Sequence, residues 1–259
     1  MKQPTHISSR KSSVGDERKD IMAVTVDIKA LLQAGAHFGH KTSRWHPKMA
    51  PYIHSKRNGS HVIDLVKTVE GLEVALPFLT KTVAGGKQVL LVGTKRQAKE
   101  IVRATADEVS MPYVVERWMG GMLTNSKTIN GRIKRLKDLE TKMESGELAN
   151  RYNKLEVQRF QEEIDELNFK LGGIKDMQGM PGAIFVADVT TEEIAIREAR
   201  KLGIPVVGIV DTNADPRLVD YVIPANDDAI KALQLILDYV KAAIQEGVAS
   251  RKDTKEEAK

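Results

Sequence analysis

Hydrophobic residues in this chain form two kinds of pattern, short continuous runs and longer stripes with helical spacing. The helical stripes predict a last helix from Asn226 or Asp227 to about residue 245, and earlier helices over 69–83, 95–109 and 191–201. Thr190 and Glu193 have the spacing of a capping box for the helix over 191–201. Short apolar strands that alternate with helices are typical of an α/β fold with a parallel sheet covered on both faces. The continuous runs predict five such strands, at 89–92, 113–115, 183–187, 206–210 and 221–223.

The segment before these strands follows a different pattern. Residues 27–34 predict a short helix that ends at Gly35. Residues 36–50 show no period and are predicted to form a loop. The dipeptide Asn58-Gly59 predicts a β-hairpin, because it separates two short runs at 52–55 and 61–64.

One stretch, 126–171, interrupts the alternation because it contains no strand pattern. Gly146 lies in a turn between two apolar stripes with helical spacing, so the stretch is predicted to form an antiparallel coiled-coil hairpin that projects from the sheet. The first stripe consists of Ile129, Ile133, Leu136, Leu139 and Met143. The second consists of Val157, Phe160, Ile164, Leu167 and Leu171.

These patterns divide the chain into segments. An α/β domain is expected from 23–125 together with 172–246, with the hairpin at 126–171 inserted between the two parts. Residues 1–22 and 247–259 are rich in polar and charged side chains and are expected to be disordered tails.

Composition excludes several classes of protein. The sequence has no cysteine, which excludes disulfide scaffolds, thiolate zinc sites and cysteine nucleophiles. It has no apolar run of the length that a membrane helix needs and no apolar core of a signal peptide, so a cytoplasmic location without membrane contact is expected.

The net charge of +5 conceals an uneven distribution. Residues 23–61 contain six Lys and Arg but only one acid, Asp27, and five of the six histidines lie in the same segment. A basic segment with interleaved aromatic residues is typical of a contact with a polyanion. A solvated basic loop remains the alternative at this point.

An enzyme active site and a metal site are the alternatives to a polyanion contact. The strand-to-helix junction at 93–96 could hold a phosphate and the loop 211–215 carries carboxylates, but neither a glycine-rich nucleotide motif nor a neighbouring acid–base partner is present. His37 and His40 have a spacing that metal sites use, but no glutamate completes the motif and few acids are near in sequence. We therefore expect no catalytic residues, no metal and no cofactor.

Nucleic-acid binding agrees better with the basic residues, because cations pair with phosphates while exposed rings can stack on unpaired bases. The expected RNA-binding residues are Lys41, Arg44, His46, Lys48, Lys56, Arg57, Lys95, Arg96, Arg117, Asn125, Lys127, Arg132, Lys134 and Arg135. The residues expected to shape the loops are Trp45, Pro47, Trp118, Gly120 and Gly121.

Several long motifs occur in an order that resembles one family. They are GAHFGHKTSRWHPKMAPYI at 35–53, LVGTKR at 91–96, RWMGGMLTNSKT at 117–128, IKRLKDLE at 133–140, LGGIKDM at 171–177, IPVVGIVDTNADP at 204–216 and DYVIPANDDAI at 220–230. Together they resemble the bacterial small-subunit ribosomal protein S-two (uS-two) family over about residues 23–247.

The resemblance implies a flavodoxin-like three-layer domain, with a parallel sheet of about five strands and an inserted helical hairpin. It implies a structural role on the small ribosomal subunit, where the chain would bind rRNA and neighbouring ribosomal proteins without forming a homo-oligomer. Some relatives help to hold ribosomal protein S-one, which makes that protein a further expected partner. The alternative function is that of an α/β enzyme that binds a phosphate ligand with the loops at 93–96 and 211–215.

Two features depart from the family pattern. The family usually begins near Met22, so residues 1–21 are an extension or reflect a misassigned start. Many members carry an aromatic residue where this chain has Ser126, so no stacking role is assigned to that position.

Overall fold

A five-stranded parallel sheet forms the centre of the molecule. The computed structural model describes residues 25–257, so the tail expected at 1–22 lies outside the described residues. The strand order is β5-β4-β6-β7-β8. The strands are β4 (Val89–Val92), β5 (Tyr113–Val114), β6 (Ala183–Val186), β7 (Val206–Val210) and β8 (Tyr221–Pro224). Every residue of β4, β6 and β7 is buried, which explains their continuous apolar runs and confirms the predicted α/β class.

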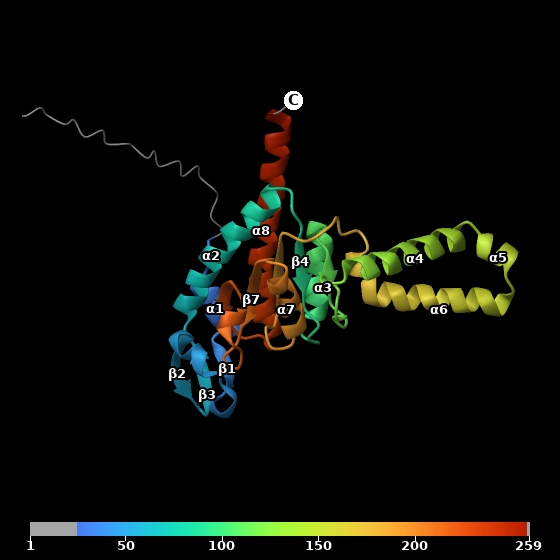
Figure 1. Cartoon of the computed structure of the whole chain (residues 1–259). Coiled ribbons are helices and arrows are strands. Elements are labelled where there is room, and N and C mark those ends of the chain that lie inside the picture. Colours follow the sequence, from blue (N-terminus) through green and yellow to red (C-terminus); the bar gives the residue numbers. More distant parts are fainter. Residues whose placement is uncertain (1–24, 258–259) are drawn as a thin grey trace, which may run out of the picture.

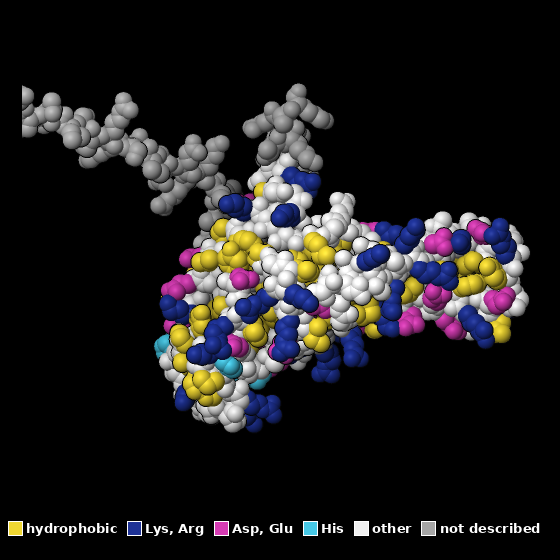
Figure 2. All heavy atoms as spheres, viewed as in Figure 1, with side chains coloured by type: hydrophobic (Ala, Val, Ile, Leu, Met, Phe, Trp, Pro, Cys, Tyr) yellow, Lys and Arg dark blue, Asp and Glu magenta, His cyan; other side chains and the backbone are white. Residues whose placement is uncertain are grey.

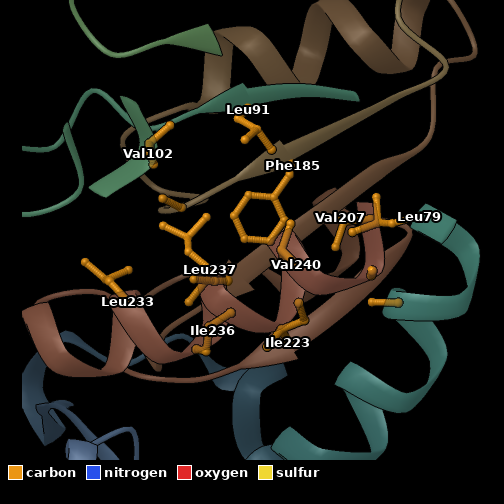
Figure 3. Close-up of a cluster of buried hydrophobic side chains, with 14 of the residues drawn as sticks. Leu79, Leu91, Val102, Phe185, Val207, Ile223, Leu233, Ile236, Leu237 and Val240 are labelled. Carbon is orange, nitrogen blue, oxygen red and sulfur yellow. The ribbon is translucent and has the colours of Figure 1, made fainter. Parts of the chain in front are cut away.

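Helices cover both faces of this sheet (Figure 1). On one face lie α2 (Leu65–Ala84), α3 (Lys99–Val109) and the long α8 (Ile230–Glu257). Figure 3 shows Phe185 of β6 between the sheet and α8, near Leu237 and Val240. Full burial of such a side chain contributes roughly 1.5–3 kcal/mol to folding. On the other face α7 (Glu193–Lys201) packs with the loop before the hairpin.

The segment before the sheet forms a small module of its own. It follows α1 (Ile28–Ala34), which Asp27 caps and which ends before Gly35; the end at Gly35 was predicted. Three antiparallel strands follow in the order β1-β3-β2: β1 (Phe38–Lys41), β2 (Ile53–Arg57) and β3 (Ser60–Ile63). Asn58 and Gly59 both have positive φ, which is the turn that their dipeptide predicts. We call residues 36–63 the N-terminal module.

The prediction of a loop at 36–50 is wrong. β1 and two 3₁₀ turns, η1 (Thr42–Arg44) and η2 (Pro47–Tyr52), occupy it. The side chains of β1 are exposed or half-buried, so this strand has no apolar run by which the sequence could reveal it. Its pairing with β3 is a tertiary contact.

The hairpin consists of α4 (Ser126–Glu144), the short helix α5 (Glu147–Arg151) and α6 (Lys154–Leu171). Figure 1 shows α4 and α6 side by side, pointing away from the sheet, as the two stripes predict. Its outer part has a small core of its own, formed by Leu136, Leu139 and Ile164. At its base Ile129 and Leu171 belong instead to the core under the sheet.

Three local predictions are wrong. Thr190 and Glu193 make no capping box, because Asp188 accepts the hydrogen bonds from the backbone N–H groups of Thr190 and Thr191. The helix predicted from residue 95 begins at Lys99. α8 continues through Glu257 instead of giving way to a tail at 247, since Gly247 packs closely against Thr80 and Val83 of α2.

Candidate nucleic-acid interface

All five parallel strands end at one edge of the sheet, which we call the carboxyl edge. The loops that leave it cover 93–98, 115–125, 187–192, 211–215 and 225–229. The N-terminal module docks on the same edge through backbone hydrogen bonds: His46 N–H donates to the carbonyl of Thr212 (2.7 Å), and Asn226 N–H donates to that of Ala36 (3.0 Å). The His40 N–H donates to Thr212 Oγ1 at 2.9 Å. The N-terminal module therefore adjoins the loops at 211–215 and 225–229 of the carboxyl edge.

Most of the expected RNA-binding residues lie exposed on or beside this edge. Within residues 25–251 they make no ion pair with an acidic side chain, so their charges are open to an external anion. Figure 2 shows Lys and Arg side chains in an interrupted row from the N-terminal module toward the hairpin. The exposed members are Lys41, Arg44, Lys48, Lys56, Arg57, Arg96, Arg117, Lys127, Arg132 and Lys134.

Lys95 differs from its neighbour Arg96. Its Nζ lies 2.7 Å from Asp227 and from Asp228, and 3.3 Å from Asp188. Burial alone would lower the pKa of Lys95, but hydrogen bonds to the two aspartates outweigh this effect and raise the pKa. Lys95 therefore neutralises acids inside the edge and offers little to a phosphate.

Three other expected residues are also held by the protein itself. Arg135 bridges α4 to Glu163 of α6, with Nε 3.1 Å from Oε1. The half-buried ring of His46 accepts from the Lys48 N–H, and its Nε2 lies 4.0 Å from Asp215. Asn125 is exposed at the start of α4, where its side chain accepts from the Thr128 hydroxyl.

The two tryptophans have different surroundings. Trp118 is 7% exposed, and its Nε1–H donates to Glu198. Trp45 is half-buried, with its ring centroid 5.1 Å from that of His61 and the Lys56 Nζ 5.8 Å above it.

Pro47 begins the turn η2, and Gly121 has the positive φ that an L side chain resists; Gly120 is exposed with open space beside its Cα. Nothing around Gly120 requires a glycine, and the loop-shaping role of all five residues stays a prediction.

The structure brings together an acidic cluster that the sequence did not reveal. His40 Nδ1 lies 3.0 Å from Asp211, and this hydrogen bond raises the pKa of His40. Burial, followed by repulsion from Asp188 and Asp211, raises the pKa of Asp227 to about 7. Asp211 and Asp227 stand 171 and 187 residues after His40, so distance in sequence conceals the cluster.

His40, Asp211 and Asp227 could hold a metal ion, since each offers a ligand atom within 4.8 Å of the others. The Lys95 ammonium already lies 2.7 Å from Asp227 and supplies positive charge there. Of the two histidines considered for a metal from sequence, only His40 belongs to this group: its Nδ1 faces Asp211, whereas the ring of His37 lies 4.0 Å from that of Phe38.

The loops of the enzyme alternative are likewise occupied by the chain. The Thr94 N–H, which would point at a bound phosphate, donates to Glu192 at 2.6 Å. Asp211 accepts from the backbone and hydroxyl of Thr212 and faces His40. A cavity of about 500 Å³ lies elsewhere, beside Gln88 and Ser110 at the strands' opposite ends.

Two comparisons with known proteins agree. The family model described as Ribosomal protein S2 matches residues 31–247. The small ribosomal subunit protein uS2 of Oleidesulfovibrio alaskensis is 51% identical over 232 residues, covering 90% of this chain and 89% of the relative. That of Chloroflexus aggregans is 49% identical over 231 residues, covering 89% of this chain and 97% of the relative. That of Coprothermobacter proteolyticus is 51% identical over 230 residues, with 89% and 85% covered.

Proposed function

The chain belongs to the ribosomal protein S2 family, and on that premise we propose that its carboxyl edge is the surface that binds small-subunit rRNA. Members of this family are structural constituents of the small ribosomal subunit and not enzymes, so the protein acts in translation as part of a cytoplasmic ribonucleoprotein. It associates there with rRNA and with other ribosomal proteins. The enzyme alternative has no support from the family.

One observation carries the proposal: among the residues described to 251, ten exposed Lys and Arg without ion pairs lie in the N-terminal module, in two loops of the carboxyl edge and in the first half of α4. Phosphate contacts supply much of the affinity for RNA, because each neutralised phosphate releases counterions. An ammonium or guanidinium group already bound to a carboxylate cannot do this without losing its partner. We accordingly assign direct phosphate contacts to the ten exposed cations and a structural role to Lys95 and Arg135.

The hairpin is proposed to be a second, weaker attachment. Lys127, Arg132 and Lys134 at its base continue the basic surface of the edge, while the outer part carries both charge signs. We propose that the sheet domain, 23–125 with 172–246, folds as the main body and that 126–171 serves as a docking arm for rRNA or neighbouring proteins.

Ribosomal protein S-one remains a proposed partner. The direct test is to reconstitute small subunits with and without the chain and to measure how much S-one sediments with each. Equal retention of S-one would remove it from the set of partners.

No homo-oligomer is proposed. Among residues 25–251 no helix has the length and apolarity to span a membrane.

The rRNA proposal is tested by rebinding the chain to small subunits that lack it, at increasing salt. We expect log affinity to fall linearly with log salt, with a slope of about −0.7 to −0.9 for each phosphate neutralised. An affinity that stays constant from low to moderate salt would contradict binding through phosphates.

A further inference from the structure

One buried carboxylate has no role in the interface described so far. Glu198 lies on the inner face of α7 beside Ala195 and Ala199, and it is only 8% exposed. An ionised carboxylate at such a position is strongly unfavourable unless hydrogen bonds replace its water.

Five donors from the loop before α4 surround this carboxylate. Its Oε1 accepts from the Gly121 N–H (2.6 Å) and the Trp118 Nε1–H (3.2 Å). Its Oε2 accepts from the N–H of Leu123, from the N–H of Thr124 and from the Thr124 hydroxyl, each at 3.0 Å. Burial alone would raise the pKa of Glu198, but the hydrogen bonds outweigh it and hold the pKa below its ordinary value.

We propose that Glu198 is a positioning residue for rRNA: its carboxylate binds the backbone amides of Gly121, Leu123 and Thr124 as a phosphate would, so that the loop offers RNA only its outward side chains. The proposal rests on the function proposed above. Successive N–H groups that converge on one point form an anion site. Here the protein's own carboxylate fills that site, which leaves Arg117 and Lys127 as the groups that reach phosphate.

The geometry links the carboxylate to both ends of the loop. Arg117 precedes Trp118, and Asn125 follows Thr124 and donates its N–H to the carbonyl of Gly121 at 2.8 Å. α4 begins at the next residue, Ser126. The distance between Arg117 and Lys127 therefore depends on the turn that Glu198 holds.

A neighbouring glutamate shows that this arrangement is specific. Glu192 precedes α7, is 2% exposed and accepts one backbone hydrogen bond, from Thr94 at 2.6 Å. Burial raises the pKa of Glu192, whereas the pKa of Glu198 is lowered. The larger number of donors around Glu198 accounts for the opposite directions of the two pKa shifts.

The experiment uses Glu198→Gln with a charge-matched control, Glu193→Gln, on the exposed side of the same helix. Both variants remove one negative charge, so long-range electrostatics alone would strengthen RNA binding equally in both. The positioning role predicts instead that Glu198→Gln binds subunits lacking the chain about tenfold more weakly, because unpaired amides release the loop. Glu193→Gln should bind like the parent or slightly better.

Hydrogen exchange on the free chain provides the second readout. The amides of Gly121, Leu123 and Thr124 should exchange about tenfold faster, or more, in Glu198→Gln than in the parent. Their exchange rates should be unchanged in Glu193→Gln. If Glu198→Gln fails to fold, Trp118→Phe replaces it, since this variant keeps a ring and removes one donor to the carboxylate. The same faster exchange is expected for Trp118→Phe, to a smaller degree.

Different results would overturn the positioning role of Glu198 and the rRNA contact of its loop. Unchanged exchange and parent-like binding in Glu198→Gln, or unchanged exchange in a folded Trp118→Phe, would overturn the role of Glu198. Arg117→Gln and Lys127→Gln test the loop as an RNA contact. If these two bind like the parent while the exchange rates still rise in Glu198→Gln, the anchor exists but the loop does not bind RNA, and the positioning role is overturned.

Discussion

The carboxyl edge and the hairpin beyond residue 134 are both rich in Lys and Arg, but their cations have different surroundings. At the edge, taken together with the N-terminal module and with α4 up to Lys134, ten of them are exposed without an acidic partner among residues 25–251. On the hairpin, from 135 to 171, five of the seven form ion pairs: Arg135, Lys137, Lys142, Arg151 and Lys170. Counting charges along the sequence therefore does not distinguish the two regions, whereas asking which cations form ion pairs does.

Packing separates the same two regions. The edge loops contribute Trp118, Met122 and Leu123 to the core under the sheet. The outer hairpin packs around its own small cluster of Leu136, Leu139 and Ile164. We therefore expect damage at the edge to affect the whole domain and damage in the outer hairpin to remain local.

The largest expected effect comes from truncating an aromatic side chain at the edge. Trp118→Ala should lower the free energy of unfolding by about 3–5 kcal/mol, because it leaves a cavity and removes a donor to Glu198. Trp45→Ala should cost less, since Trp45 is only half-buried. Leu139→Ala should reduce the helix content of the hairpin and leave the main unfolding transition in place. Urea unfolding curves, measured by circular dichroism, test all three variants. If Leu139→Ala and Trp118→Ala lowered the midpoint of one common unfolding transition by the same amount, the edge and the outer hairpin would not unfold separately and the account would be contradicted.

A smaller effect on stability is expected from replacing the buried carboxylate of Glu198. Glu198→Gln should lower stability by roughly 1–3 kcal/mol at neutral pH, because it leaves buried donors poorly satisfied. The pKa of Glu198 is lowered in the folded state, so its contribution is present above its ordinary value and is lost as pH falls through the folded pKa. The difference in stability between Glu198→Gln and the parent should therefore narrow from pH 7 toward strong acid.

The matched hairpin carboxylate is Glu166, which is exposed and paired with Lys170. Glu166→Gln should change stability much less than Glu198→Gln at neutral pH, since a surface ion pair is screened by solvent. Denaturant midpoints of both variants at several pH values provide the measurement. A gap for Glu198→Gln that stays constant down to pH 2 would contradict the assigned hydrogen bonds.

Removing the outer hairpin should have a smaller effect on attachment than losing the edge. Glu140 binds Asn168 and Lys175, so a truncation that keeps these contacts replaces 141–161 by a short loop. The sheet domain should stay folded, because closing a surface excursion changes loop entropy only slowly. Binding to the subunit should weaken by roughly tenfold or less. Cosedimentation measures the affinity; a truncated chain that unfolds, or one that binds like the parent, would show that the arm has another purpose.

The sequence predicted the buried parts of the fold well. The strands at 89–92 and 206–210 match β4 and β7 because both faces of a parallel strand are apolar. β1 was missed because its side chains follow no apolar alternation and its pairing depends on β3. The continuation of α8 past Gly247 depends on contact with α2, which no local pattern records.

The interface was predicted by residue type but not by environment. Lys95 and Arg96 are equivalent cations in the sequence, yet aspartates from two distant loops surround only Lys95. The partners of Glu198 lie 74 to 80 residues away, and Thr212 lies 172 residues from His40. Sequence spacing carries no information about such contacts, so the role of Glu198 and the cluster at His40 required the structure.

The most direct test of the account compares two sets of four charges. One variant changes Arg44, Lys48, Arg96 and Arg117 to Gln at the edge, and the other changes Arg135, Lys137, Lys142 and Lys170 to Gln on the hairpin. Both lose the same net charge, and affinity for subunits lacking the chain is measured against salt. The account predicts that the log–log slope becomes shallower by about 3 for the edge variant and changes by less than about 1 for the hairpin variant. Equal changes in the two variants, or a larger change for the hairpin variant, would contradict the claim that the unpaired cations of the carboxyl edge bind rRNA.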